Sequence, residues 1–164
     1  MTSASTPIEV RFARAGDRQV LIELCLKLLQ HLDQFEHDIL PSLENAEWMV
    51  DVLFLPAATR EEGILIAWDK DKAVGAIFWA IQNLPYQMRF KTAYGYGTYV
   101  DPNYQNQKVG TLLRQKAIQA LKKLGVQKLL GMVHFANEIS VKASDRLGFK
   151  PHARLDLLDL EQFL

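Results

Sequence analysis

The sequence contains little cysteine and no long hydrophobic run. Cys25 is the only cysteine among 164 residues, which excludes an internal disulfide, and its place on a helical stripe of leucines predicts a packed core thiol. The longest apolar run, residues 73–81, is too short to span a bilayer, and the polar residues 1–7 do not resemble a signal peptide. No stretch rich in Pro, Gly or Ser divides the chain. We therefore expect one cytoplasmic domain over residues 1–164 that does not enter a membrane.

The sequence also lacks a net charge, but its charges are segregated. Residues 28–59 contain no Lys or Arg, and residues 102–137 contain no Asp or Glu. The first region should attract cations and the second anions. Lys108 and Arg114 are the better candidates for phosphate contacts, whereas the other lysines of the second region are expected to solvate helix faces. A short basic cluster without interleaved aromatics, in a neutral chain, does not indicate nucleic-acid binding.

The most informative segment, residues 100–113, passes from a strand into a helix through a polar loop. Asp101 and Pro102 are typical of a strand-ending turn, and apolar residues then recur at helical spacing as far as Gly125, a natural C-cap. The first N–H groups of a helix have no intrahelical partner, and the helix macrodipole is positive at that end. The loop is therefore predicted to bind an anion such as a phosphate. The alternative is an ordinary solvated turn.

The pattern of apolar residues predicts strands and helices in a defined order. We expect a strand over 8–12, a helix from 16–17 through Leu28, a second helix from about 41–42 to just before Pro56, a hairpin of strands over 64–68 and 73–81, a strand over 90–100, the long helix, a strand over 126–134, a helix over 138–147, and one or two closing strands within 149–160. Because the long helix connects them, strands 90–100 and 126–134 should pair in parallel. This order predicts an α/β (α+β) fold.

The polar loop carries a motif that identifies a family. Gln105, Lys108 and Gly110 are spaced as in the Gln/Arg-x-x-Gly-x-Gly/Ala signature of the GCN5-related N-acetyltransferases (GNAT), which the chain resembles. The order of elements is similar to that family's fold over nearly the whole chain. The resemblance implies an acetyltransferase fold, in which helices flank a mixed, mostly antiparallel central sheet of about six or seven strands. Lys108 stands where the family usually has glycine, at a cost of about 1 kcal/mol or more if a positive φ is needed.

A second motif follows the predicted strand 126–134. Asn137, Ser140 and Ser144 stand at i, i+3 and i+7, and with Gly148 and Phe149 they resemble the family's Asn-x-x-Ala-x-x-x-Tyr-x-x-x-Gly-Phe segment. In the family, this helix face meets the pantetheine arm and the sulfur of the cofactor. Asn137 is also a common N-cap, and Gly148-Phe149 is a common helix exit. The capping of the helix and a contact with the cofactor are compatible roles for this segment.

The resemblance implies acetyl-CoA as co-substrate and assigns residues to it. The main-chain N–H of Val100 would hydrogen-bond the thioester oxygen, and the amides of residues 107–111 would hold the pyrophosphate together with the side chains of Gln105 and Lys108. The cofactor-binding residues implied in this way are Tyr99, Val100, Gln105, Gln107, Lys108, Val109, Gly110, Thr111, Asn137 and Ser140.

The proton donor is less clearly assigned. Ser144 occupies the family's usual tyrosine position, but a serine hydroxyl is shorter and much less acidic. Tyr104 and His134 are candidate substitutes, with a hydrogen-bonded strand histidine as the alternative for His134. Because a CoA thiolate is a fairly good leaving group, an acid is helpful rather than indispensable.

The proton acceptor is equally open. Some family members carry a carboxylate at the position of Tyr94, so a water held by Tyr94, Tyr96 or Thr98 is the favoured relay. Strand alternation predicts that these three residues share one face with Val100. The alternative for the two tyrosines is a place in the hydrophobic core.

The acceptor amine is expected near residues 31–40, which flank the substrate in this family. The predicted substrate-binding residues are Asp33, Glu36 and Tyr96. The carboxylates of Asp33 and Glu36 should attract a protonated amine. No metal is expected, since the histidines and aspartates of this region lack metal-ligand spacing. The predicted partner is a small-molecule amine or a peptide amino terminus, and the resemblance favours a homodimer.

Three functions are open at this point. The leading one is an acyl-CoA-dependent N-acetyltransferase that transfers acetyl directly to a small cationic amine or an amino terminus. The second is a non-catalytic acyl-CoA-binding or regulatory module of the same fold, suggested by Lys108 and Ser144. The third is a structural α/β domain that binds no cofactor.

Overall fold

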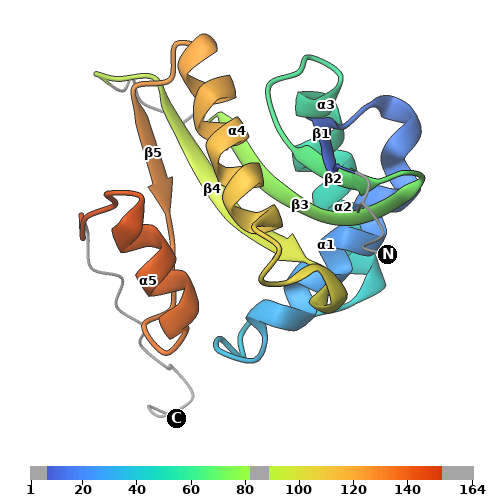
Figure 1. Ribbon diagram of the computed structural model, residues 1–164, viewed down its shortest axis with the longest axis horizontal. Coiled ribbons are helices and arrows are strands. Elements are labelled where there is room, and N and C mark those ends of the chain that lie inside the picture. Colours follow the sequence, from blue (N-terminus) through green and yellow to red (C-terminus); the bar gives the residue numbers. More distant parts are fainter. Residues whose placement is uncertain (1–6, 82–88, 153–164) are drawn as a thin grey trace, which may run out of the picture. The chain divides into compact units, whose positions relative to one another are not determined.

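The computed structural model describes residues 7–81 and 89–152 (Figure 1). The chain divides into two compact units, Met1–Met132 and Val133–Leu164. The described elements of the first unit are β1 (Glu9–Phe12), α1 (Arg18–Leu32), α2 (Leu43–Met49), α3 (Leu55–Ala58), β2 (Leu65–Asp69), β3 (Lys72–Ile81), β4 (Thr92–Val100), α4 (Val109–Lys123) and β5 (Lys128–Gly131). The second unit contains α5 (Glu138–Arg146). The expectation of a single domain stays a prediction.

The first unit is built on a mixed sheet with the order β1-β2-β3-β4-β5. Neighbouring strands are antiparallel from β1 to β4, and β4 and β5 are parallel. The predicted hairpin and the predicted parallel pair are therefore confirmed. The described sheet has five strands rather than six or seven. Of the segment predicted to close the sheet, residues 149–152 form no strand and the remainder lies outside the described residues.

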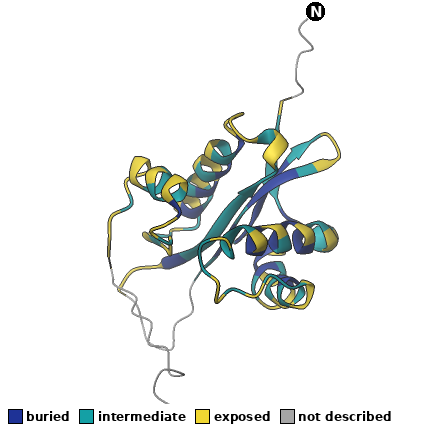
Figure 2. Cartoon of the chain, turned by 90° about the horizontal axis from the view of Figure 1, so that it is seen from below, coloured by how far each residue is buried: buried dark blue, intermediate teal, exposed yellow. Residues whose placement is uncertain are grey.

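Helices cover both faces of this sheet, and each face has its own hydrophobic cluster (Figure 1). On one face, α1, α2 and α3 pack against residues such as Ile66 and Phe78. On the other face, α4 buries Val109, Leu113 and its later apolar residues against Trp79 and its neighbours. Figure 2 shows buried positions concentrated in the sheet and on the sides of the helices that face it. Burial of these apolar stripes is the main driving force for the layered arrangement.

The second predicted helix does not end before Pro56. It continues from α2 through a π-helical stretch, Val50–Phe54, into α3, and Pro56 lies in the first turn of α3. A proline is tolerated there because the first N–H groups of a helix need no intrahelical acceptor. The helix thus extends to Ala58 and buries Ala57 and Ala58.

Strand β4 contains a bulge that changes which residues share a face. Gly95 pairs with Trp79 and Gly97 with Phe78, so Tyr96 is an extra residue in β4. Beyond the bulge, Val100 packs against the α4 cluster, whereas Tyr96 packs against the α1 cluster. The expectation that Tyr94, Tyr96, Thr98 and Val100 share one face is therefore wrong, because simple alternation ignores the bulge.

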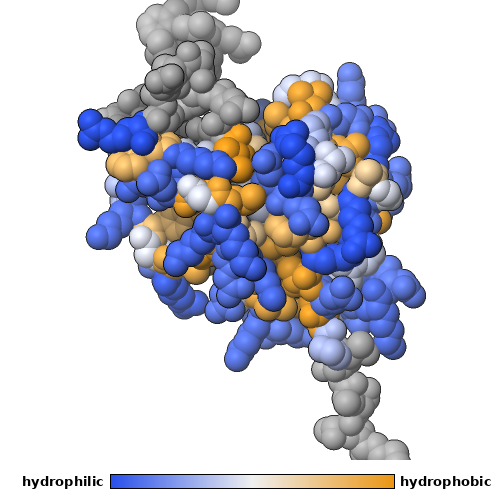
Figure 3. Space-filling model, turned by 90° about the horizontal axis from the view of Figure 1, so that it is seen from above, coloured by the Kyte–Doolittle hydropathy of each residue, from blue (hydrophilic) through white to orange (hydrophobic). Residues whose placement is uncertain are grey.

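The surface shown in Figure 3 mixes hydrophilic side chains with small hydrophobic patches. No helix in residues 7–81 and 89–152 is both long enough and apolar enough to cross a membrane.

Candidate functional site

The C-terminal half of β4 has an edge that β5 does not cover. The ladder between the two strands joins Thr92–Gly95 to Lys128–Gly131, whereas β4 continues to Val100. The Asp101 N–H donates to the Val74 carbonyl oxygen at 2.8 Å, in the direction of β3. Successive N–H groups of a strand point to opposite sides, so the Val100 N–H points away from β3. Within the described sheet, no strand residue accepts a hydrogen bond from it.

Helix α4 begins directly after this strand end and presents its first backbone amides. Its first intrahelical bond runs from the Leu112 N–H to the Lys108 carbonyl oxygen at 2.9 Å. No side chain caps the helix, and its first turn contains no acidic residue. The amides of Val109, Gly110 and Thr111 thus form the positive end of a 15-residue helix. The loop thus offers the free amides on which the predicted anion site depends, and the anion site itself stays a prediction.

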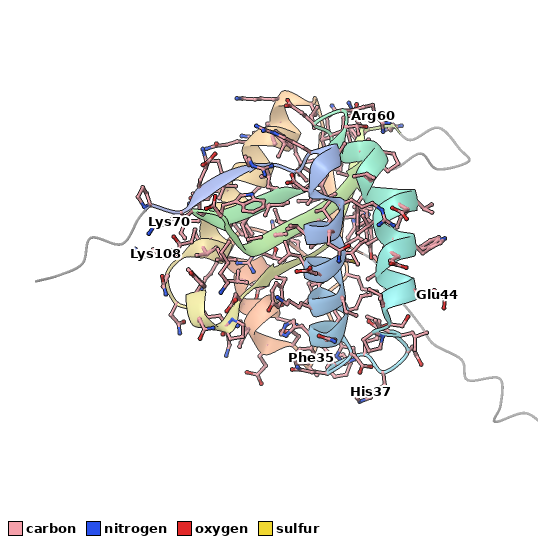
Figure 4. The ribbon with its side chains drawn as sticks, turned by 90° about the vertical axis from the view of Figure 1, so that its right-hand side faces the viewer. Phe35, His37, Glu44, Arg60, Lys70 and Lys108 are labelled. Atoms are coloured by element: carbon pink, nitrogen blue, oxygen red, sulfur yellow. The ribbon has the colours of Figure 1, made fainter. Side chains whose placement is uncertain are left out.

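Lys108 occupies a conformation that favours glycine. Its φ is 64° and its ψ is 10°, in the left-handed region, and Asn106 is also left-handed with a φ of 63°. The positive φ anticipated from the family's glycine is therefore real, and it destabilises the folded chain by about 1 kcal/mol. The Lys108 side chain is exposed on the outside of the loop (Figure 4). It is free to contribute a charge to a bound anion.

The two glutamines of the loop differ in their contacts. The Gln107 side chain donates to the Asn103 carbonyl oxygen at 3.0 Å and so braces the loop. The Gln105 side chain is exposed, and the described residues give it no hydrogen-bond partner. Of these two glutamines, Gln105 is thus the one whose side chain is placed to contact a ligand.

Tyr104 belongs to a structural cluster at the β2–β3 turn. Its hydroxyl donates to Asp69 Oδ2 at 2.8 Å, and the Lys72 ammonium lies 5.1 Å from its ring centroid. The hydrogen bond to Asp69 is the main reason that the pKa of Tyr104 is raised. A tyrosine whose proton is already donated to a carboxylate is a poor acid. We therefore assign Tyr104 a structural role instead of the predicted role of proton donor.

The contacts of Tyr104 with Asp69 and Lys72 were not predicted from the sequence. Lys72 forms an ion pair of 3.1 Å with Asp101, whose carboxylate also accepts a hydrogen bond from the Asn103 N–H at 2.9 Å. Asp101 before Pro102 was a visible turn signal, but nothing in the sequence linked it to the charged hairpin turn. Packing alone brings Asp69 and Lys72 beside the loop.

The face of β4 that packs against α1 carries a group of aromatic side chains. The rings of Tyr94 and Tyr96 have centroids 5.1 Å apart, and Tyr96 also packs edge-on against Phe54 at 5.3 Å. Burial raises the pKa of Tyr94, and the charges of Tyr96 and Glu36 add to this effect. The Glu36 carboxylate is therefore within electrostatic range of the Tyr94 hydroxyl. Tyr99 packs against the same cluster, and burial raises its pKa too.

The connection after α1 contains the two acidic residues that were predicted to bind the substrate. The Asp33 N–H donates to the Leu29 carbonyl oxygen at 2.9 Å and ends α1, and the Glu36 N–H donates to Leu32 at 3.0 Å. Both side chains are partly exposed. In the part of the chain that the structure describes, no three His, Cys, Asp or Glu residues are grouped so that they could hold a metal ion.

The second unit contains the other predicted site residues. The Asn137 side chain caps α5 by accepting a hydrogen bond from the Ser140 N–H at 3.2 Å, and it is 5% exposed. Ser140 and Ser144 are partly buried on α5. After the helix, Gly148 has a φ of 85°, and the Phe149 N–H donates to the Ser144 carbonyl oxygen at 3.1 Å. The predicted cap and helix exit are both confirmed.

His134 is not a strand residue. Strand β5 ends at Gly131, and His134 lies in the turn before α5, where its Nδ1 accepts a hydrogen bond from the Ala136 N–H at 3.1 Å. A neutral imidazole in this arrangement carries its proton on Nε2. The predicted strand ended too late because residues 132–134 continue the apolar pattern of β5 without joining the sheet.

Comparison with known proteins agrees with this architecture. A model of the acetyltransferase (GNAT) family matches residues 26–149. The solved structure of aminoglycoside N-acetyltransferase AAC(6')-Iy in complex with CoA has a TM-score of 0.70 and 13% identity, covering 97% of this chain and 98% of that chain. A comparison with curated protein sequences finds no match.

Two further structures share the fold. An aminoglycoside acetyltransferase from an uncultured soil metagenomic sample, in complex with sisomicin, has a TM-score of 0.62 and 17% identity over 93% of both chains. A mutant of the BH1408 protein from Bacillus halodurans has a TM-score of 0.69 and 18% identity, covering 93% of this chain and 99% of that chain. The family model covers most of the chain, and the strand-to-helix junction has the expected geometry. The chain therefore belongs to the GNAT acetyltransferase family.

Proposed function

We propose that this protein is an acyl-CoA-dependent N-acetyltransferase that transfers acetyl directly from acetyl-CoA to a small cationic amine or an amino terminus. The observation that carries the proposal is the Val100 N–H, which points away from β3 at the end of β4, beside the amides that begin α4. A thioester oxygen at the first position and a pyrophosphate at the second match one elongated ligand. Family membership supports acetyl-CoA as that ligand.

The reaction needs few groups from the protein. The neutral amine nitrogen attacks the thioester carbon, a C–N bond forms, and negative charge develops on the oxygen. The Val100 N–H stabilises that charge. The C–S bond then breaks, the CoA thiolate leaves, and the amine nitrogen loses its proton. Holding donor and acceptor in line supplies much of the rate enhancement.

The proton of the amine is best accepted on the aromatic face of β4. A raised pKa keeps the Tyr94 hydroxyl protonated at neutral pH, so Tyr94 orients a water instead of acting as the base itself. Glu36, whose charge reaches Tyr94, is the carboxylate that takes the proton from this water. Tyr96 borders the same face, and Asp33 and Glu36 attract the cationic amine. Thr98 is no longer a candidate, because it pairs with Ile77 of the α4 cluster beyond the bulge.

The thiolate needs no strong acid. A thiol with a pKa near ~8.5 leaves readily as the anion. The roles predicted for Ser144 and His134 as donors, and for Asn137 and Ser140 as pantetheine contacts, stay predictions. So do the homodimer and the cytoplasmic location.

A thiol-release assay tests the proposal. The protein is incubated with acetyl-CoA and a panel of aminoglycosides, polyamines and peptides with free amino termini, and free CoA is measured. We expect release with at least one cationic amine, and loss of that release in Glu36→Gln. Calorimetric binding of CoA without thiol release on any amine would contradict the enzymatic proposal.

The second candidate is a non-catalytic acyl-CoA-binding module. It is favoured by the left-handed Lys108, which departs from the family's glycine, and by Ser144 at the tyrosine position. This module would bind CoA without turnover. The variants Tyr94→Phe and His134→Ala would therefore have no activity to lose. Measurable turnover that falls in either variant excludes it.

A further inference from the structure

Helix α2 and the π-helical stretch that follows it are apolar on two opposite sides. The inner side consists of Ala46, Val50 and Phe54, which are buried in the α1 cluster. Trp48 and Val52 lie about half a turn away from Val50, and they are 55% and 53% exposed. A helix that buries one apolar stripe in its own domain normally carries polar residues on the opposite side. Packing within this unit therefore does not explain Trp48 and Val52.

Carboxylates flank these two exposed apolar residues. Glu44 precedes Trp48 by about one helical turn, and Figure 4 shows it on the outer side of α2. Glu47 is the sequence neighbour of Trp48. Neither carboxylate forms an ion pair with a residue in 7–81 or 89–152. We call Glu44, Glu47, Trp48 and Val52 the outer α2 patch. Its acidic and aromatic character suits a partner surface that combines an apolar hollow with cations.

A hollow of this kind lies between the C-terminal end of α4 and the start of β5. Its volume is about 160 Å³, and its apolar lining consists of Ile118, Leu121, Val126 and Leu129. The exposed Lys122 and Lys128 are its cationic lining residues. An apolar cavity of about 150 Å³ accommodates a benzene molecule. The hollow therefore has room for an aromatic ring.

The two lysines of the hollow have no carboxylate partner within the part of the chain that the structure describes. The Lys128 ammonium lies 5.1 Å from the centroid of the Phe90 ring, which is a contact with an aromatic face and not with an anion. Residues 102–137, which include α4 and β5, contain no Asp or Glu. The charge of the hollow is therefore complementary to that of the outer α2 patch.

We propose that the outer α2 patch of one copy docks into the hollow of a second copy of this chain. The Trp48 ring occupies the hollow, and Glu44 and Glu47 lie opposite Lys122 and Lys128. A tryptophan that fills a pocket, surrounded by charge pairs, has the character of an interface hot spot. Charge complementarity fixes which surfaces meet, because two acidic patches or two basic hollows repel each other. The lysines thereby gain a role beyond the solvation expected from the sequence.

This contact is heterologous, because each copy contributes a different surface to it. The outer α2 patch and the hollow both belong to the unit Met1–Met132, where α2 and α4 cover opposite faces of the sheet. One copy thus meets one neighbour through its patch and another through its hollow, and copies add head to tail. Added salt should weaken the contact, because its charges are exposed. No residue assigned to the reaction takes part, so the inference does not depend on the proposed function.

Two variants that each lose one surface test the proposal. Trp48→Ala removes the ring and keeps the hollow, whereas Lys122→Glu/Lys128→Glu reverses the charge of the hollow and keeps the ring. Sedimentation velocity and light scattering at low salt measure the mass. We expect the wild type to form oligomers that grow with concentration, and each variant alone to associate roughly tenfold more weakly or worse. An equimolar mixture of the two variants should form a one-to-one dimer, because one supplies the ring and the other the hollow.

Lys116→Glu is the matched control. Lys116 is exposed on α4 but does not line the hollow, so this variant should associate like the wild type. Tryptophan fluorescence provides a local readout, since Trp68 is partly buried and Trp79 is fully buried. Emission of the wild type should shift to shorter wavelength as the concentration rises, and Trp48→Ala should show no such shift.

Three results would overturn the proposal. The first is a wild type that stays monomeric at low salt; if the lysine variant then also melts at a lower temperature, the hollow serves another segment of the same chain. The second is loss of association in Trp48→Ala but not in the lysine variant, which would mean that two outer α2 patches pair with each other. The third is loss of association in both variants with no dimer in their mixture.

Discussion

The Tyr104 hydroxyl donates a hydrogen bond of 2.8 Å to Asp69, a residue 35 positions earlier in the chain. The bond ties the loop between β4 and α4 to the turn between β2 and β3. The ion pair of Lys72 with Asp101 forms a second tie between the same two segments. The loop that leads into the candidate anion site is therefore held by the hairpin as well as by its own turn.

Tyr104→Phe separates the structural role of this residue from the catalytic role predicted from sequence. The ring remains and only the hydroxyl is lost, so we expect a slightly lower melting temperature and kcat within about threefold of the wild type. Steady-state kinetics and thermal unfolding provide both quantities. A fall in kcat of about a hundredfold or more, with KM unchanged, would restore Tyr104 as the proton donor.

Two substitutions at Lys108 separate its charge from its backbone conformation. Lys108→Gly removes the left-handed penalty and should raise the free energy of unfolding by about 1 kcal/mol, whereas Lys108→Ala keeps the penalty. Both remove the charge and should weaken CoA binding by about 1 to 2 kcal/mol, less at high salt. Urea denaturation and calorimetry at two salt concentrations measure these effects. Unchanged CoA affinity in both variants would mean that Lys108 only solvates the turn.

Gly75 allows β3 to approach the end of β4 closely. A Cβ at this position would lie 2.7 Å from the Tyr99 carbonyl oxygen and 3.3 Å from Val100 Cα, so the backbone must move in Gly75→Ala. We expect a loss of about 1 to 3 kcal/mol of stability and, because the Val100 N–H shifts, a fall in kcat on the order of tenfold or more.

Gly16→Ala is the control for this substitution. A Cβ on Gly16 meets nothing within 4 Å, so neither stability nor kcat should change appreciably. If Gly75→Ala unfolds more easily but keeps its full kcat below the melting transition, the Val100 N–H does not act on the reacting oxygen.

Cys25 should not react with thiol reagents in the native protein. It is fully buried in the α1 cluster, and burial raises its pKa to about 12. The thiolate is the reactive form, so a disulfide reagent at pH 8 should not modify the folded chain. In urea, the same reagent should titrate one thiol per chain. Rapid modification without denaturant would indicate that α1 opens easily.

The Arg11–Asp17 pair predicts a pH dependence of stability. The bidentate hydrogen bonds from Arg11, at 2.7 and 3.0 Å, are the main reason that the pKa of Asp17 is lowered. A lowered pKa means that the carboxylate stabilises the fold above its unfolded pKa of about 3.9. This contribution is lost as the pH falls through the lowered pKa.

Urea denaturation of Asp17→Asn across pH measures this contribution. The variant should be less stable than the wild type at pH 7, and the difference should vanish under acidic conditions. Asp71→Asn, on the exposed β2–β3 turn, should show little difference at any pH. A difference for Asp17→Asn that persists unchanged at low pH would mean that the ion pair is not its source.

Local signals in the sequence predicted most of the elements. The alternation in residues 8–12, the charged turn between β2 and β3, and the helical spacing up to Gly125 each depend on near neighbours in the chain. The family motif likewise lies within one loop, so the anion site at the start of α4 was predictable. Strict alternation failed at Tyr96, because the bulge there belongs to the pairing of β4 with β3, two segments that are distant in the sequence.

The sequence by itself determined the order of elements, the strand-to-helix junction and the family, because propensity, turn chemistry and motif spacing are properties of adjacent residues. Only the tertiary structure decided what each side chain does. It tied Tyr104 to Asp69, left Trp48 exposed on the outer side of α2, and separated Val100 from Tyr96 across the sheet. These outcomes depend on strand register and packing between distant segments, which no local pattern specifies.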